Sequence, residues 1–365
     1  MKVLMINVVC GIRSTGRICT DTAKVLEQNG HEVKIAYGRE TVPEKYQYLS
    51  YRIGTELNVK TNALMARLLD NEGFNAKKQT IDFLKWADEY NPDLLWLHNL
   101  HGYYINIEML FNWIKSRPQM QVKWLLHDCW AFTGHCAHFT VAKCYKWKTE
   151  CKDCPQTKEY PTSLIFSNCN DNFKRKRQAF TGVKNMTIIT PSSWLANLVR
   201  ESFLKEYPVE VVHNTIDTNI FKPTPSDFRE RYGLEDKKII LGVSGVWNER
   251  KGFNDFMKLS KMLDDNYKIV LVGLSEKQLK DLPSNIIGIK HTNGQKELAE
   301  IYTAADVFLN LTYEDNYPTV NLESQACGTP CITYRTGGSI ESVPKDNVIE
   351  VGNLTALSEK ILKLV

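Results

Sequence analysis

Two acidic residues, Asp315 and Glu323, have side chains and a spacing suited to binding a sugar joined to a phosphate. Asp315 falls in a polar turn, and Glu323 lies roughly two turns along the helix that follows. Pro318 suits the first turn of that helix and Gly328 ends it. The free N–H groups and the dipole at a helix start favour phosphate. The segment therefore predicts a ligand that carries both hydroxyls and phosphate.

The elements around these acids follow from the apolar pattern. Residues 307–309 are all apolar and predict a buried strand that leads into the turn. Val320, Leu322 and Ala326 predict the buried face of the helix, and Pro330 prevents the helix from continuing. A capped helix with two solvated acids is the simpler alternative.

The segment from residue 315 to residue 330 resembles a motif of the retaining family-4 glycosyltransferases, which have the GT-B architecture. That motif is E-x7-E followed by A-x-A-C-G-x-P. Residues 326–330, Ala-Cys-Gly-Thr-Pro, match its second part, and Asp315 stands where the family has its first Glu. Glu314 is the neighbouring candidate for this acid, but the spacing to Glu323 selects Asp315. The resemblance implies that Asp315 holds the sugar hydroxyls and Glu323 the nucleotide ribose.

A second segment resembles the diphosphate-binding turn of the same family, G-R-x4-K-G. Gly245 and Lys251 match this pattern, whereas Val246 replaces the family Arg. Arg250, beside Lys251, is the candidate replacement for the missing guanidinium. The resemblance implies that Lys251, supported by Arg250, holds the donor diphosphate, where cationic donors neutralise developing charge.

The start of the predicted helix completes the implied donor site. The resemblance implies that backbone amides after Pro318, those of Thr319 and Val320, cap the diphosphate. It also implies retention of configuration by front-face attack, with the leaving phosphate accepting the proton of the acceptor hydroxyl.

The N-terminal residues predict a β-α-β start. Residues 1–9 predict a buried strand, and Ser14 or Thr15 is expected to cap the next helix. The turn between them is neither G-x-G-x-x-G nor a P-loop, which disfavours a dinucleotide or ATP site. In the resembling family this turn approaches the donor diphosphate, a role that Gly16 would take here. A tight turn without a ligand is the alternative.

Histidines follow two further predicted strands. His98 and His101 come after the apolar residues 94–97, and His127 and Asp128 come after residues 123–126. Ligands of open α/β sheets gather beyond the carboxyl ends of the strands, so both segments are candidates for the site. The second resembles the family His-Asp motif, which implies that His127 lies near the transferred sugar.

Four cysteines come close together after these histidines: Cys136, Cys144, Cys151 and Cys154. The last two form a C-x2-C pair, so the four predict a structural zinc site that holds a loop with little core of its own. His135 and His138 are alternative ligands, and four reduced thiols are the alternative without metal. Catalysis requires no metal or cofactor in this interpretation.

A basic run at residues 173–177, Phe-Lys-Arg-Lys-Arg, has two interpretations. It is either a solvated helix face or a contact with anionic headgroups or a lipid diphosphate acceptor. The second predicts a saccharide or lipid-linked saccharide acceptor at an anionic membrane surface.

Composition limits the remaining possibilities. The 365 residues predict two domains, and the balance of 46 basic and 42 acidic residues is not a nucleic-acid signature. No apolar stretch is long enough to span a bilayer, and the N-terminus lacks the features of a signal peptide. We therefore expect a cytoplasmic protein, peripheral at the inner face of the membrane, whose cysteines are not disulfide-bonded.

Alternating strands and helices predict an α/β protein with two Rossmann-like domains facing across a cleft, the GT-B architecture. Residues 1–214 form the predicted acceptor domain, with a cysteine-rich loop at 129–155, and residues 215–365 form the donor domain. The predicted activity is that of a hexosyltransferase acting on a nucleotide-sugar and a polysaccharide precursor. A sugar-nucleotide epimerase or phosphorylase of similar fold, and a nucleotide-sugar-binding protein without catalysis, are the alternatives.

Overall fold

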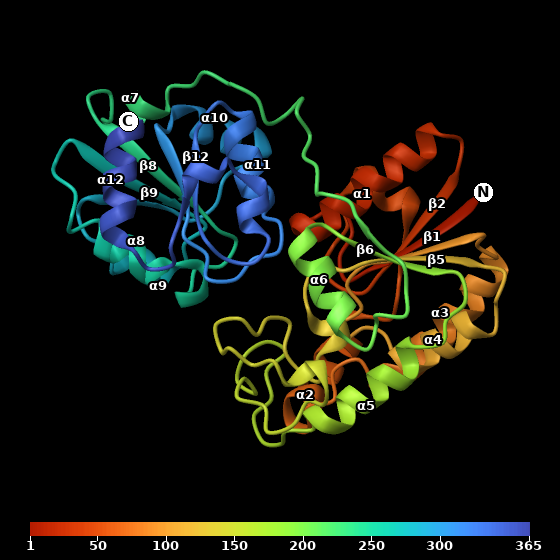
Figure 1. Ribbon diagram of the computed structural model, residues 1–365. Helices are drawn as coiled ribbons and strands as arrows, with labels where there is room; N and C mark the ends of the chain where they lie inside the picture. The colour runs from red at the N-terminus through yellow and green to blue at the C-terminus, as the bar shows by residue number, and fades with distance from the viewer. The chain divides into compact units, whose positions relative to one another are not determined.

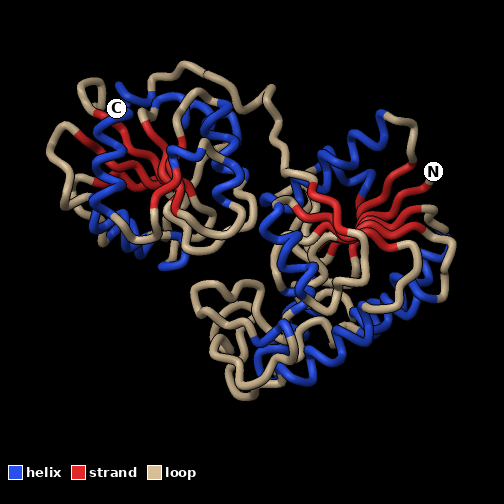
Figure 2. Tube along the Cα trace, in the orientation of Figure 1, coloured by secondary structure: helices blue, strands red, loops and turns tan.

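The computed structural model describes residues 1–365 and divides into two units, Met1–His213 and Asn214–Val365. Each unit is an α/β domain with its own sheet and its own helices (Figures 1 and 2). No helix in either unit is both long enough and apolar enough to cross a membrane.

The first unit is built on a seven-stranded sheet in which all paired strands are parallel. In spatial order its strands are β3 (Ser50–Arg52), β2 (Glu32–Tyr37), β1 (Lys2–Asn7), β4 (Leu94–Leu97), β5 (Gln121–Leu125), β6 (Met186–Thr190) and β7 (Val209–Val211). This is a doubly wound order whose switch point lies between β1 and β4. The crevice expected for a ligand is therefore beyond the carboxyl ends of these two strands.

Successive side chains of the central strand β1 point to opposite faces of the sheet, so they pack into two separate cores. Leu4 and Ile6 belong to the larger core, whereas Val3 and Met5 belong to the core beneath the first helix. The helices of the unit are α1 (Arg13–Gln28), α2 (Glu56–Leu69), α3 (Lys77–Tyr90), α4 (Ile107–Lys115), α5 (Cys169–Phe180) and α6 (Ser193–Glu201). Figure 1 shows α1 on one face of the sheet and α3, α4 and α5 on the other.

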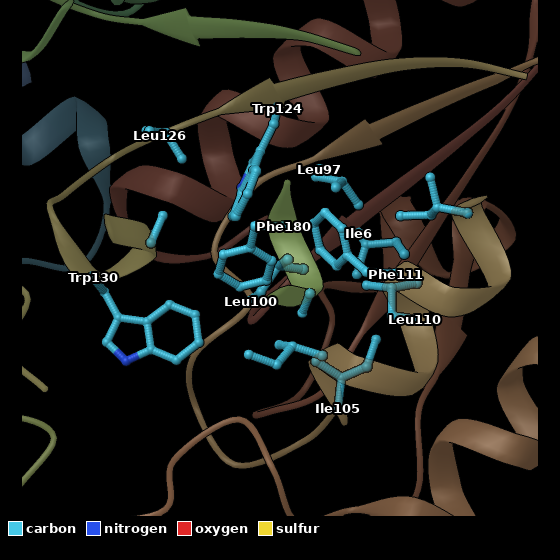
Figure 3. Close-up of a cluster of buried hydrophobic side chains, with 14 of the residues drawn as sticks. Ile6, Leu97, Leu100, Ile105, Leu110, Phe111, Trp124, Leu126, Trp130 and Phe180 are labelled. Atoms are coloured by element: carbon cyan, nitrogen blue, oxygen red, sulfur yellow. The ribbon is translucent and has the colours of Figure 1, made fainter. Parts of the chain in front are cut away.

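Aromatic side chains fill the centre of the larger core (Figure 3). The ring of Phe180 from α5 lies 4.6 Å from that of Phe111 on α4 and 4.8 Å from that of Trp124 on β5, between ring centroids. The indole N–H of Trp124 donates to the carbonyl of His98, at 3.1 Å. This contact ties the core to the segment that follows β4, where a ligand site is expected.

One local prediction in this unit is wrong. Ser14 and Thr15 do not cap α1, because the helix already begins at Arg13 and its N-cap, Ile12, makes no side-chain cap hydrogen bond.

The basic run is only partly solvated. Within α5, Phe173 and Lys176 are buried, and Arg175 makes two hydrogen bonds to Glu108, at 2.8 and 2.7 Å. The Lys176 ammonium donates to two backbone carbonyls at 2.9 and 3.1 Å. These three residues therefore hold α5 in place, whereas Lys174 and Arg177 are exposed.

The second unit repeats the plan with a six-stranded sheet in which all paired strands are parallel. Its strands are, in spatial order, β10 (Ile286–Ile289), β9 (Tyr267–Val272), β8 (Lys238–Val243), β11 (Val307–Asn310), β12 (Cys331–Tyr334) and β13 (Val348–Ile349). Its helices are α7 (Phe228–Tyr232), α8 (Phe253–Leu259), α9 (Glu276–Lys280), α10 (Gln295–Ala304), α11 (Thr319–Ala326) and α12 (Leu354–Leu364). The switch point lies between β8 and β11.

Helix α11 is buried through polar side chains, which the sequence analysis did not predict. Its buried residues are Asn321, Glu323 and Ser324, whereas Val320, Leu322 and Ala326 are only partly buried. Burying an acid and an amide is costly unless they are hydrogen-bonded, so a helix of this kind is a candidate for a functional role.

Candidate functional site

The loops at the switch point of the second unit form the first candidate site. The loop after β8 runs into a short 3₁₀ turn, Glu249–Lys251, and then into α8. Asn248 begins this turn, with its side-chain oxygen accepting the backbone N–H of Lys251 at 3.0 Å. The turn presents two adjacent cations next to the loop that follows β11.

The central contact is an ion pair between Lys251 and Asp315. Lys251 Nζ lies 2.5 Å from Asp315 Oδ2, and both side chains are mostly buried. Arg250 reaches the same loop, where its guanidinium donates to the carbonyl of Glu314 at 3.0 Å. The backbone N–H of Tyr313 donates to the carbonyl of Arg250 at 2.8 Å. The structure thus brings Arg250 and Lys251 together with Asp315, which lies 64 residues after Lys251 in the sequence.

Two glycines allow these loops to approach each other. Gly252 has a φ of +76°, and a Cβ there would lie 2.2 Å from the carbonyl oxygen of Leu311. Gly337, in the loop after β12, has a φ of +48°, and a Cβ there would lie 2.1 Å from the carbonyl oxygen of Asp315. Only glycine fits both positions, because a side chain would collide with backbone in a strained conformation.

The start of α11 lies directly after this loop, with Pro318 as its N-cap residue. Thr319 and Val320 occupy the first turn, so their backbone N–H groups have no partner within the helix. Asn321 anchors the helix, because its amide group bonds to Asn310 at 2.8 Å and to Ser342 at 2.9 Å. The helix start is therefore rigidly set beside the Lys251–Asp315 pair.

Glu323 is buried further along α11. Its Oε2 accepts a hydrogen bond from the hydroxyl of Tyr302 at 3.2 Å. Burial, followed by the charge of Glu323, raises the pKa of Tyr302 well above its ordinary value, so this hydroxyl stays a donor. Tyr302 could not be predicted from the sequence, because a tyrosine within a helix pattern gives no signal of its distant partner.

Val246 and Gly245 occupy the other end of the predicted phosphate-binding turn. Val246, where the resembling family has Arg, is 65% exposed. A Cβ at Gly245 would have open space around it, so no steric reason for glycine exists there. The crowding occurs instead at Gly273, where a Cβ would lie 1.7 Å from the carbonyl oxygen of Ser244.

The first unit contributes a second polar cluster beyond β4 and β5. His98 Nδ1 lies 3.1 Å from His127 Nε2, and the two rings stack with centroids 5.4 Å apart. Burial lowers the pKa of His127 to about 4 and that of His98 well below its ordinary value. Both rings are therefore neutral near pH 7, so His127 can offer a hydrogen bond but not a positive charge.

The cluster also contains a histidine–aspartate pair, which was only partly predicted. His101 Nε2 lies 2.8 Å from Asp128 Oδ2, and His101 Nδ1 lies 3.0 Å from the hydroxyl of Tyr160. Burial alone would raise the pKa of Asp128, but the charge and hydrogen bond of His101 outweigh it and lower this pKa. An ionised Asp128 fixes the His101 tautomer. Tyr160 comes from a loop without a recognisable pattern and was missed.

Gly16 lies inside the first turn of α1 and not in the turn before it. A Cβ at Gly16 would lie 3.0 Å from Val9 Cγ2, and the carbonyl of Gly16 accepts the N–H of Gly11 at 3.1 Å. Gly11, with a φ of +73°, makes the sharp turn. A donor-binding role for Gly16 stays a prediction, as do the other binding roles taken from the resemblance.

The four cysteines predicted as zinc ligands, Cys136, Cys144, Cys151 and Cys154, are all free thiols in the structure. They line one small cavity in the loop before α5, together with Cys169 and His135. His138, the other alternative ligand, does not line this cavity.

Comparisons with known proteins find glycosyltransferases. Residues 226–365, most of the second unit, match the family model described as "Glycosyl transferases group 1". WcaC of Escherichia coli (strain K12), named as a colanic acid biosynthesis glycosyl transferase, is 23% identical over the whole of this chain and 89% of its own. N-acetyl-alpha-D-glucosaminyl L-malate synthase of Bacillus anthracis is 25% identical over 50% of this chain and 51% of its own.

Solved structures show the same fold at low identity. Sucrose-phosphate synthase of Thermosynechococcus elongatus superposes with a TM-score of 0.68 at 15% identity, covering 99% of this chain and 89% of its own. Anabaena Alr3699/HepE in complex with UDP gives a TM-score of 0.66 at 15% identity, covering 100% and 89%. The chain is a glycosyltransferase of the GT-B architecture. Its second unit carries the group 1 glycosyltransferase domain.

Proposed function

We propose that the chain is a retaining glycosyltransferase that moves a sugar from a nucleotide-sugar to a hydroxyl of a saccharide or lipid-linked saccharide in polysaccharide assembly. The observation that carries the proposal is the Lys251–Asp315 pair, 2.5 Å apart beside the start of α11 at the switch point of the second unit. A cation and a helix start suit the donor diphosphate, and the acid suits the hydroxyls of the sugar.

The relatives support this class of substrate. Besides WcaC, the capsular polysaccharide biosynthesis glycosyltransferase CapM of Staphylococcus aureus is 24% identical over 46% of this chain. Processive diacylglycerol alpha-glucosyltransferase of Acholeplasma laidlawii, whose name specifies a lipid acceptor, is 27% identical over 44%. HepE, with the same fold, binds UDP and UDP-glucose.

A thermal-shift screen of UDP, GDP and ADP tests the donor. A ligand at 100 times its Kd stabilises the folded state by about 2.7 kcal/mol. For a unit of this size we expect UDP to raise Tm by about 5 to 10 °C. No shift with any of the three nucleotides would contradict the proposed donor site.

Product analysis separates the proposed transferase from an epimerase and from a nucleotide-sugar-binding protein without catalysis. A transferase releases the nucleoside diphosphate only when an acceptor is present, and it forms a glycoside of retained configuration. An epimerase interconverts nucleotide-sugars without any acceptor. A nucleotide-sugar-binding protein binds the donor but does not turn it over with any acceptor, whether that acceptor is a lipid-linked or a soluble saccharide.

An exposed apolar patch supports a membrane-bound acceptor better than the basic run does. Leu164, Ile165 and Phe166 are 68%, 64% and 54% exposed, and the N–H of Leu164 donates to the carbonyl of Arg67 at the end of α2, at 2.7 Å. Leu57, Leu64 and Met65 on α2 are exposed too, interspersed with exposed Lys60 and Arg67. Clustered apolar and basic side chains suit an anionic lipid surface.

Replacing residues 164–166 by serine should weaken binding to anionic vesicles at least tenfold, because each apolar side chain contributes on the order of 1 kcal/mol or more when it enters lipid. Vesicle sedimentation measures this partition. The control is Leu362→Ser, which removes a leucine that is 57% exposed on α12 in the other unit. Equal partition of the triple variant and the unchanged protein would remove the patch from the membrane contact.

A further inference from the structure

The loop between η2 (Trp130–Phe132) and α5 has almost no regular structure. Its one element is η3 (Lys146–Lys148), and the rest is drawn as loop in Figure 2. Such a long irregular segment is uncommon inside a domain unless something other than secondary structure holds it. The Lys146 ammonium donates to the carbonyls of Lys152 and Asp153 at 3.0 and 2.9 Å, but these bonds are exposed and contribute little.

Five cysteines surround one cavity in this loop. The cavity has a volume of about 20 Å³, and the thiols that line it belong to Cys136, Cys144, Cys151, Cys154 and Cys169. A space of this size holds a single small particle, such as one water molecule or one ion. Thiol-lined walls do not suit water, because the S–H group is a weak hydrogen-bonding partner.

Backbone amides point at the sulfurs. The N–H of Gly134 donates to Cys151 Sγ at 3.2 Å. The sulfur of Cys154 accepts from the N–H of Gln156, and that of Cys169 accepts from the N–H of Cys154. Hydrogen bonds of this kind to ligating atoms are a common outer-shell feature of metal sites, where they orient the ligands.

A histidine at the wall of the cavity supplies an independent signal. His135 is 2% exposed and lines the cavity. Its Nδ1 lies 2.5 Å from Asp70 Oδ1, whereas its Nε2 is buried and has no hydrogen-bond partner. A buried nitrogen left without a partner is costly, and a carboxylate behind the opposite nitrogen is the usual support of a histidine near a metal.

From these contacts we propose that the cavity binds one structural zinc ion through the sulfurs of Cys136, Cys144, Cys151 and Cys154. Four thiolates prefer zinc in tetrahedral geometry, with Zn–S distances of about 2.3 Å. Binding replaces four S–H protons, which pass to the solvent, by four Zn–S bonds. Cys169 then supports Cys154, and His135 lies at the edge of the cavity.

The four cysteine side chains have to rearrange before they can coordinate the ion. As the structure stands, no group of three or more His, Cys, Asp or Glu side chains is set to hold a metal ion. The sulfurs therefore turn into the cavity when zinc binds, which a loop with few regular hydrogen bonds permits. Gly134 cannot give way, because a Cβ there would lie 2.0 Å from the carbonyl oxygen of Cys169.

Zinc content of the whole chain, purified without added metal and kept reduced, tests the proposal. We expect close to one zinc per chain in the unchanged protein by elemental analysis. We expect less than one tenth of that in Cys151→Ser. Cys19→Ala is the matched control, since it removes a buried thiol from α1 and should keep the zinc. Cobalt(II) should give the intense absorption of a tetrahedral thiolate site.

Three results would overturn the inference. The first is unchanged protein that contains no zinc and takes up none when zinc is added to the reduced chain. The second is a Cys154–Cys169 disulfide found by mass spectrometry in metal-free protein. The third is full zinc content in Cys151→Ser. These readouts need no substrate, and the unchanged protein alone decides if the variant fails to fold.

Discussion

Asp315→Asn should lower kcat by on the order of 10²-fold or more, with a smaller change in the donor Kd. Asp315 is mostly buried and lies 2.5 Å from Lys251, beside the start of α11. A carboxylate fixed in this way is preorganised to grip the hydroxyls of the sugar as the bond to phosphate breaks. Asparagine keeps the shape but loses the charge, so the loss falls on the transition state.

Glu323→Gln is the contrasting variant. Glu323 is buried and bonded to Tyr302, away from the loop that carries Asp315. If it holds the ribose, its contact is the same in the ground and transition states, so the change should raise KM for the donor and leave kcat nearly unchanged. Asp315→Glu should keep part of the activity that Asp315→Asn loses. Full kcat in Asp315→Asn together with loss in Glu314→Gln would show that the spacing argument selected the wrong acid.

Lys251→Ala should weaken the binding of a nucleoside diphosphate by about 1.5 to 3 kcal/mol, or roughly 10- to 150-fold in Kd, through lost charge-assisted hydrogen bonds. The removal also leaves Asp315 without the cation that lies beside it in the structure. The negative charge of Asp315, no longer offset by Lys251, then repels the diphosphate. Titration calorimetry measures the change directly.

The controls for Lys251 use the same chemistry elsewhere. Lys363→Ala removes an exposed lysine from the last turn of α12 and should leave the Kd unchanged. In the double variant Lys251→Ala with Asp315→Asn, the losses in affinity should not add, because the two residues are in contact. An unchanged Kd in Lys251→Ala would exclude this lysine from the donor site.

Much of the sheet scaffold could be predicted from the sequence, because each strand of a doubly covered parallel sheet is a short apolar run between turn signals. Residues 94–97 and 307–309 were predicted as strands, and they are β4 and most of β11. The sequence does not indicate which residues of β1 belong to which core, because Val3, Leu4, Met5 and Ile6 are all apolar and all fully buried.

The candidate site could be predicted only where its residues are close in sequence. Asp315 and the start of α11 came from one segment, but their pairing with Lys251 depends on two strands meeting in the sheet. Tyr160 was missed because irregular loops carry no period, and Cys169 was missed because it stands at the start of α5, apart from the other four cysteines in sequence. The prediction for the basic run was wrong at Lys176 for another reason. Composition suggested that this lysine is exposed to solvent. Two backbone carbonyls offset the cost of burying it, and no sequence pattern reveals these partners.

The division of the chain at His213 has a consequence for its synthesis. The two units follow each other without any strand of one inserted into the sheet of the other. In each sheet, however, a central strand is synthesised first. Its second neighbour comes much later in the chain, since β1 pairs with β4 and β8 pairs with β11. Pairing over such separations slows folding, and domains generally fold as units during translation, the N-terminal one first. The first unit can thus complete its sheet while the ribosome is still making the second unit, so incomplete sheets of the two units need never meet.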